Sequence, residues 1–136
     1  MSGSRAFLDT NIFIYMYTSS EPQKKEACLS VLDASICVTS TQALHEICNV
    51  LTKKIQTPFA DIRQILWDIC RICEVRQPQR QTAFSALDLK ERYGYSYYDC
   101  LMLASALDGH CDIFYSQDMS DGQLIENRLR IVDPFS

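Results

Sequence analysis

Near its start the chain reads Arg5-Ala6-Phe7-Leu8-Asp9-Thr10-Asn11-Ile12-Phe13-Ile14-Tyr15. The first four of these residues are mostly apolar and predict a short buried strand. The next three are residues that cap helices, so a helix should begin here and continue through the apolar residues that follow. An acid directly after such a strand would lie at the strand's carboxyl end, which is where open α/β sheets bind ligands.

Strands and helices alternate along the rest of the chain. Further short apolar runs predict strands at 36–38, 74–76, 112–115 and 129–132. Apolar periodicity and capping residues predict helices at 21–32, 41–55, 58–69, 79–93 and 96–107. We therefore predict an α/β fold with a mainly parallel central sheet of about five short strands flanked by helices.

Length and composition indicate a single globular unit. The chain has 136 residues, 47% of them hydrophobic and 22% charged, which suits one domain with one core. Because we find no linker or repeat, we expect residues 1–136 to form a single domain. No apolar run approaches the roughly 20 residues that span a membrane, and residues 1–5 lack the features of an export signal. We therefore expect a cytoplasmic protein with no membrane partner.

Net charge and cysteine content limit which ligands and which cysteine chemistry we expect. The net charge is −4 and the 13 Lys and Arg residues are scattered, which disfavours a broad non-specific nucleic-acid surface but leaves room for a local basic rim. The seven cysteines are expected to be reduced thiols, since their number is odd and most lie in apolar contexts. Cys70 and Cys73 have a C-x-x-C spacing, but they end an apolar helix and are predicted to pack in the core. Trp67 is likewise predicted to be in the core first, with a partner surface as the alternative.

Four carboxylates are the most informative residues, because each lies beside or inside an apolar segment where charge is rarely buried without a partner. They are Asp9, Glu46, Asp99 and Asp118. Asp9 and Asp118 both follow predicted strands at their carboxyl ends. Like charges gathered in one cleft repel unless a cation intervenes. Hard ions such as Mg²⁺ or Mn²⁺ prefer oxygen ligands of this kind and can activate water for attack on phosphorus.

Each acid also has a local explanation that involves no ligand. Asp9 could cap the helix that follows it. Glu46 could lie at the edge of a buried helix face with its carboxylate reaching solvent. Asp99 could complete a capping box with Ser96. Asp118 could belong to a polar turn, and Asp121 nearby could serve the turn or the site.

The four acids lie in segments that, in this order, resemble the PIN domain family and most of all its VapC-type toxins. The segments are Phe7-Leu8-Asp9-Thr10-Asn11-Ile12, Ala43-Leu44-His45-Glu46, Tyr98-Asp99-Cys100-Leu101-Met102-Leu103-Ala104-Ser105-Ala106 and Tyr115-Ser116-Gln117-Asp118-Met119. Residues 129–135 resemble the closing strand of the family. The resemblance covers nearly the whole chain and implies a PIN-like three-layer fold.

The resemblance also implies a function, namely a Mg²⁺- or Mn²⁺-dependent endoribonuclease that hydrolyses RNA phosphodiester bonds. Asp9 and Asp99 would be the principal metal ligands, and Glu46 and Asp118 would complete the catalytic site. Asp121 remains an alternative for the fourth acid. Residues that would orient these ligands or bind phosphate are Thr10, Asn11 and Ser116.

The same resemblance implies the toxin of a toxin–antitoxin pair, a homodimer whose cognate antitoxin inserts its tail into the acidic cleft. Two alternatives remain open at this point: a PIN-like RNA-processing nuclease outside such a pair, and a non-catalytic module that binds RNA or a partner. His45 and the tyrosines around Gly94 also have open roles. His45 should point about 100° away from Glu46 on its helix. The tyrosines around Gly94, Tyr98 among them, could pack in the core or stack on an RNA base.

Overall fold

Six strands form one sheet in the order β3-β2-β1-β4-β6-β5. The computed structural model describes residues 3–136. The strands are β1 Arg5–Leu8, β2 Ile36–Ser40, β3 Glu74–Arg76, β4 Ile113–Tyr115, β5 Leu124–Ile125 and β6 Leu129–Val132. All neighbours run parallel except β5, which pairs antiparallel with β6. The predicted α/β fold with a mainly parallel sheet is confirmed.

Within residues 3–136, six helices connect and cover the strands. They are α1 Thr10–Met16, α2 Pro22–Ala34, α3 Thr41–Lys53, α4 Phe59–Ile72, α5 Arg80–Tyr93 and α6 Tyr97–Asp108. The predicted boundaries differ from these by at most a few residues. Sequence analysis missed β5, because two residues are too few to show an alternating pattern. Its turn into β6 uses two residues with left-handed backbone, Glu126 and Asn127.

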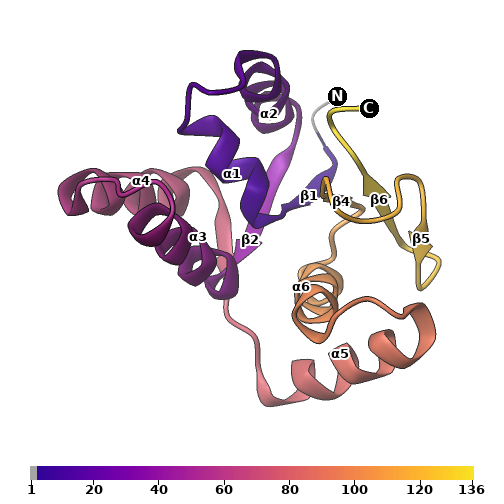
Figure 1. Ribbon diagram of the computed structural model, residues 1–136. Helices are drawn as coiled ribbons and strands as arrows, with labels where there is room; N and C mark the ends of the chain where they lie inside the picture. The colour runs from indigo at the N-terminus through magenta and orange to yellow at the C-terminus, as the bar shows by residue number, and fades with distance from the viewer. Residues whose placement is uncertain (1–2) are drawn as a thin grey trace.

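Successive residues of β1 face opposite sides of the sheet and enter two separate cores. Phe7 packs with α5 and α6, and its ring stacks on Phe114 with 5.2 Å between centroids. Leu8 packs instead with residues of α1, α2, α3 and α4. Figure 1 shows α1 and α2 on one side of the sheet and α5 and α6 on the other. The two cores thus make three layers, as the family resemblance implies.

Helix α6 is the most deeply buried helix within residues 3–136. Its buried residues are Cys100, Met102, Leu103, Ala104, Ser105 and Ala106. They point in several directions around the helix, because α6 packs between the sheet and α5. This packing places the first turn of α6, which contains Asp99, near the carboxyl ends of β1 and β2.

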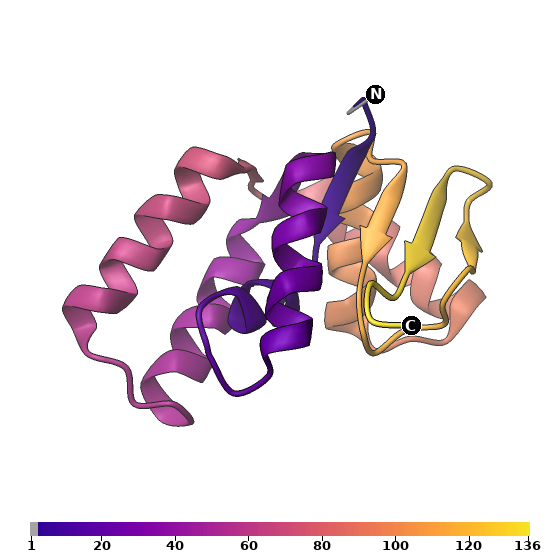
Figure 2. The same ribbon diagram turned by 90° about the horizontal axis from the view of Figure 1, so that it is seen from above.

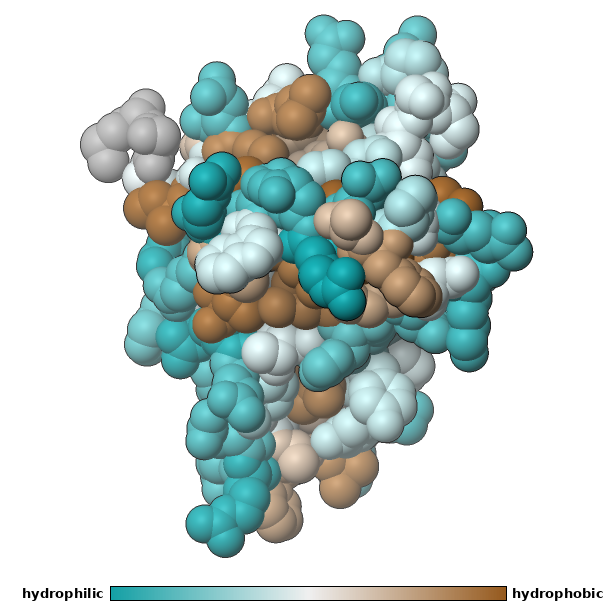
Figure 3. Space-filling model, turned by 90° about the vertical axis from the view of Figure 1, so that its left-hand side faces the viewer, coloured by the Kyte–Doolittle hydropathy of each residue, from teal (hydrophilic) through white to brown (hydrophobic). Residues whose placement is uncertain are grey.

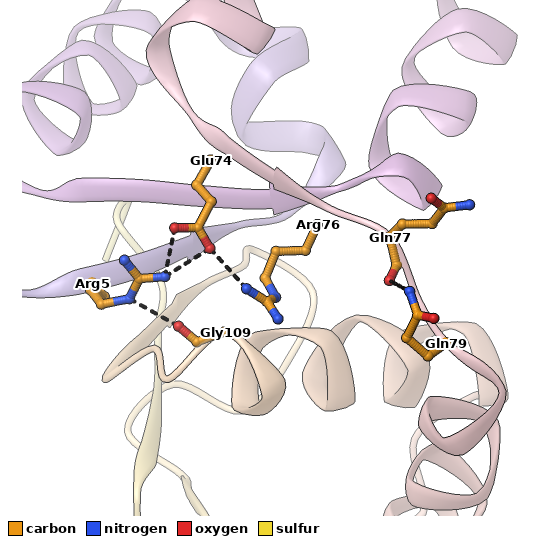
Figure 4. Close-up of polar contacts among 6 residues, drawn as sticks. All are labelled: Arg5, Glu74, Arg76, Gln77, Gln79 and Gly109. Atoms are coloured by element: carbon orange, nitrogen blue, oxygen red, sulfur yellow. Dashed lines mark hydrogen bonds and ion pairs between the residues drawn. The ribbon is translucent and has the colours of Figure 1, made fainter.

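At the amino-terminal ends of the strands, ion pairs join the starts of β1 and β3 (Figure 4). Arg5 donates two hydrogen bonds to Glu74, at 3.0 and 2.9 Å, and a third to the carbonyl of Gly109 at 2.9 Å. Arg76 donates to the same Glu74 carboxylate at 3.0 Å. A Cβ on Gly109 would lie 2.8 Å from Cδ of Arg76, so another residue here would require this arginine side chain to shift. These two cations are therefore occupied away from the acids.

Helix α4 lies at one end of the molecule, beyond α3 (Figures 1 and 2). Its inner face buries Ile62 and Ile69, whereas Phe59 and Trp67 are each 68% exposed. Figure 3 views this end and shows apolar residues between hydrophilic ones across the face. The core prediction is therefore wrong for Trp67. It is also wrong for Cys70, which is exposed, and right for Cys73, which is buried.

All seven cysteines are free thiols, five of them buried. No helix between residues 3 and 136 is both long and apolar enough to cross a membrane. Residues 1 and 2 of the expected 1–136 domain lie outside the described part of the chain.

Candidate metal centre

An acidic cavity of about 390 Å³ opens beyond the carboxyl ends of β1 and β4. Its lining residues are Asp9, Thr10, Asn11, His45, Glu46, Asn49, Val50, Asp99 and Asp118. The fold therefore gathers all four acids singled out from the sequence. They come from the end of β1, from α3, from the first turn of α6 and from the loop after β4.

Asp9 performs the local role expected from its sequence and also faces the cavity. Its Oδ1 accepts a 2.7 Å hydrogen bond from the backbone N–H of Thr10 and so caps α1. Its Oδ2 accepts from the hydroxyl of Ser116 at 2.9 Å. Burial, with a smaller contribution from the charges of Asp99 and Glu46, raises the pKa of Asp9 to about 6, although the two hydrogen bonds lower it. An acid in this position would be ionised more readily beside a cation.

Glu46 is held on both carboxylate oxygens. The hydroxyl of Thr10 donates to Oε1 at 2.7 Å, and Nε2 of Gln42 donates to Oε2 at 2.9 Å. The Gln42 amide also donates to the backbone carbonyl of Tyr98 at 3.1 Å, next to Asp99. One amide therefore links α3 to the start of α6. The sequence analysis missed Gln42, although a Gln four residues before a Glu on a helix is a recognisable pairing signal.

Asp99 lies in the first turn of α6, where the helix dipole favours a negative charge. The hydroxyl of Ser96 caps this helix by accepting from the backbone N–H of Asp99 at 3.2 Å. That bond uses the backbone of Asp99 and leaves its carboxylate available. Among residues 3–136 we find no hydrogen-bond donor to this carboxylate. The Ser96 cap and a carboxylate that faces the cavity are thus compatible in one helix turn.

The structure places Asp118 and Asp121 differently. Asp118 lines the cavity and accepts a 3.1 Å hydrogen bond from the side-chain amide of Asn11. Asp121 lies outside the lining and accepts from the backbone N–H of Asp133 at 2.8 Å. Asp121 therefore fastens the C-terminal segment. Of the two acids considered for the fourth position, only Asp118 is at the cavity.

The three polar neighbours expected to orient ligands or bind phosphate have separate positions. Thr10 is buried and contacts Glu46, and Asn11 lines the cavity and contacts Asp118. Ser116 is fully buried and contacts Asp9. Ser116 can therefore orient an acid but cannot reach a phosphate in the cavity. His45 is exposed as expected, yet it lines the same cavity as Glu46.

The electrostatics of the cavity favour a bound cation. No Lys or Arg is present among its described lining residues, so the acids lack an internal counter-charge. The donors are almost all oxygens, which suit a hard divalent ion. No three acidic, His or Cys side chains within residues 3–136 form a ready-made metal-ligand group. Mg²⁺ does not need such a cage, since it commonly takes one or two carboxylates and completes its shell with water and phosphate. The residues present fit this kind of site.

Comparison with known proteins agrees with this geometry. The sequence matches the family model of the PIN domain over residues 6–120. A search of curated proteins gave no match. Proteins of the PIN family that resemble VapC are nucleases.

Solved structures show the same fold at low sequence identity. A toxin–antitoxin complex from Klebsiella pneumoniae contains a chain with a TM-score of 0.73 and 18% identity, with 95% of this chain and 97% of that chain covered. VapBC2 from Rickettsia felis, bound to a promoter DNA fragment, gives a TM-score of 0.66 and 17% identity, with 95% of this chain and 99% of that chain covered. VapC20 of Mycobacterium tuberculosis, a toxin that cleaves the sarcin–ricin loop, gives a TM-score of 0.66 and 13% identity, with 80% of this chain and 86% of that chain covered. The resemblance inferred from the ordered acids is confirmed for family and fold.

Proposed function

Because the chain belongs to the PIN domain family, we propose that it is a Mg²⁺- or Mn²⁺-dependent endoribonuclease that acts at the acidic cavity. The observation that carries this proposal is the meeting of Asp9, Glu46, Asp99 and Asp118 in one cavity whose described lining has no Lys or Arg. The raised pKa of Asp9 supports it, since it marks a charge that the protein alone does not balance.

The surroundings of each acid suggest its role. Asp99, which has no hydrogen-bond donor among residues 3–136, and Asp9, which reaches the cavity from the end of β1, would hold the metal. Glu46 and Asp118 each accept hydrogen bonds from side chains, so they would support the site, directly or through water. Thr10 and Ser116 fix the orientation of Glu46 and Asp9. When bound, the metal supplies an activated water and offsets charge on the phosphate.

We further propose that the protein is the toxin of a toxin–antitoxin pair. The solved structures of similar fold include toxin–antitoxin complexes. A cognate antitoxin could neutralise the cavity by inserting a cationic side chain among the acids, because a charge-assisted pair would replace the metal. Exposed apolar residues on α4 and α5, such as Trp67 and Phe84, offer surfaces for the antitoxin and for a homodimer. Seven free thiols suit a reducing, cytoplasmic compartment.

A metal-titrated cleavage assay tests the enzymatic proposal. Single-stranded and structured RNAs would be incubated with wild type, Asp9→Asn, Asp99→Asn and the matched control Asp88→Asn, an exposed acid on α5. We expect cleavage by wild type and Asp88→Asn in Mg²⁺ or Mn²⁺. We expect at least a hundredfold loss in the two site variants and in chelator. Equal cleavage by all four proteins would refute the proposal.

The toxin role needs a separate experiment. Induced expression should arrest growth, and expression of Asp99→Asn should not. If Asp99→Asn arrests growth as strongly as wild type, the biological effect comes from binding rather than cleavage. If neither arrests growth while cleavage in vitro is normal, a role in RNA processing outside a toxin–antitoxin pair is favoured.

A further inference from the structure

A second, mostly apolar cavity of about 470 Å³ adjoins the acidic one. Its lining residues are Thr41, Gln42, His45, Glu46, Pro78 and Tyr98. Two of these, His45 and Glu46, also line the acidic cavity, so the two hollows are neighbours that share part of α3. We propose that this second cavity is a subsite for an unpaired nucleobase of the RNA strand, with Tyr98 as its stacking platform. This proposal rests on the proposed function, since it concerns the substrate of the same site.

The lining chemistry fits a nucleobase. Tyr98, His45 and Pro78 carry rings, and the accessible surface of the cavity is mostly apolar. A nucleobase has two apolar faces and a polar edge, and single-stranded RNA is commonly bound by stacking its bases on such side chains. The volume lies within the range of about 300–1,000 Å³ that is typical of ligand clefts.

The Tyr98 ring is exposed and is supported on one side by a second ring. It is 65% exposed, although tyrosines of this fold otherwise pack against the core, as Tyr93, Tyr95 and Tyr97 do. The ring of Tyr97 meets it edge to face, with 5.5 Å between centroids. A platform held in this way loses little conformational freedom when a base stacks on it.

The platform is also coupled to the acids. Tyr98 directly precedes Asp99 in the first turn of α6, and its carbonyl accepts from the Gln42 amide that also holds Glu46. A phosphate bound among the acids would therefore bring a base of the same strand to the adjoining hollow. This proximity to the acids favours RNA over a protein segment as the occupant.

Fluorescence of 2-aminopurine in a short single-stranded RNA tests the platform without requiring cleavage. In the Asp9→Asn background, we expect binding to quench the fluorescence through stacking. Tyr98→Ala should remove the quenching and weaken binding about tenfold, the size expected for loss of one stacked base. Tyr98→Phe should restore both. Leu124→Ala, which removes an exposed apolar side chain on β5, is the control and should bind normally.

Kinetics of the otherwise wild-type enzyme give the second readout. Tyr98→Ala should raise KM about tenfold while kcat changes by less than about twofold, and Tyr98→Phe should reverse the rise. If wild type cleaves RNA but neither KM nor quenching depends on Tyr98, the subsite proposal fails while the nuclease proposal stands. If no variant cleaves but quenching follows Tyr98, the subsite stands and hydrolysis fails. Unchanged RNA binding with weakened self-association or antitoxin binding in Tyr98→Ala would assign the ring to a protein interface and overturn the proposal.

Discussion

At the scale of single residues, Asp9 shows how one side chain can serve the fold and the site together. It caps α1 through Oδ1 and is held by Ser116 through Oδ2. These two bonds do not compensate for burial, since the pKa of its carboxyl still rises from 3.8 to about 6. In the metal-free folded protein, Asp9 therefore keeps its proton up to about pH 6, and above this pH its buried charge is not fully compensated. The buried charge of Asp9 therefore lowers the free energy of unfolding of the metal-free protein at neutral pH.

We predict that Asp9→Asn stabilises the metal-free protein in a pH-dependent way. Because the folded pKa is raised, the native state binds more protons than the unfolded state between about pH 4 and 6, so wild-type stability falls as pH rises through this window. A shift of this size corresponds to about 2–3 kcal/mol. Asn can still accept the N–H of Thr10, so it should avoid the penalty.

Urea unfolding in chelator measures this effect. Asp9→Asn should exceed wild type by about 2 kcal/mol at pH 8, and the gain should disappear below about pH 4. A difference that does not change with pH would show that the burial of this charge is not its cause.

At the scale of elements, most boundaries follow from local chemistry. Helix α5 ends at Gly94, whose backbone is left-handed with φ of 81°, a conformation that favours glycine. Helix α6 begins at Ser96, which caps the backbone N–H of Asp99. Only the two-residue β5 escaped prediction. The cap at Ser96 matters most for function, because it fixes the turn from which Asp99 and Tyr98 project.

We predict that Ser96→Ala lowers the free energy of unfolding by about 1 kcal/mol, the usual cost of losing a side-chain cap. Ser96→Asn should recover most of the loss, since Asn caps equally well. Ser85→Ala, a substitution in the middle of α5, should cost nothing because alanine favours helix interiors. Urea denaturation of the four proteins is the measurement, and equal stability of Ser96→Ala and wild type would refute the capping role.

At the scale of the whole molecule, the three layers bring together side chains that share no local relation. Ser116 and Asp9 are 107 positions apart, yet parallel pairing of β1 with β4 places them in contact. The same arrangement concentrates four acids at one edge and commits Arg5 and Arg76 to Glu74 at the other. Without a metal ion, the four acids therefore have no Lys or Arg beside them among the described lining residues of the cavity.

We predict that Mn²⁺ stabilises the entire fold. An ion at 100 times its dissociation constant should add about 2.7 kcal/mol, a rise of roughly 5–10 °C in Tm for a chain of this size. Thermal unfolding with and without Mn²⁺ measures the shift, independently of any nuclease activity. Asp99→Asn should abolish it and Asp88→Asn should retain it. An equal rise in Asp99→Asn would mean that the ion binds elsewhere.

Sequence alone determined the fold class, eleven of the elements and the four acids that line the acidic cavity. These depend on periodicity, capping residues and the order of motifs, all of which act over a few positions or are read directly along the chain. The local explanation for Asp9 as a helix cap was also correct, because capping is local chemistry. For Asp99 only half of the expected capping box forms: Ser96 accepts from its backbone N–H, but the Asp99 carboxylate does not bond back.

Tertiary structure alone decided which acid, Asp118 rather than Asp121, reaches the cavity. It also decided that Gln42 links Glu46 to Tyr98, and that Ser116 is buried against Asp9 rather than free to bind phosphate. These relations depend on strand register and on the packing of α3 and α6 against one sheet edge. Such contacts join residues that are distant in the chain, so no local pattern encodes them.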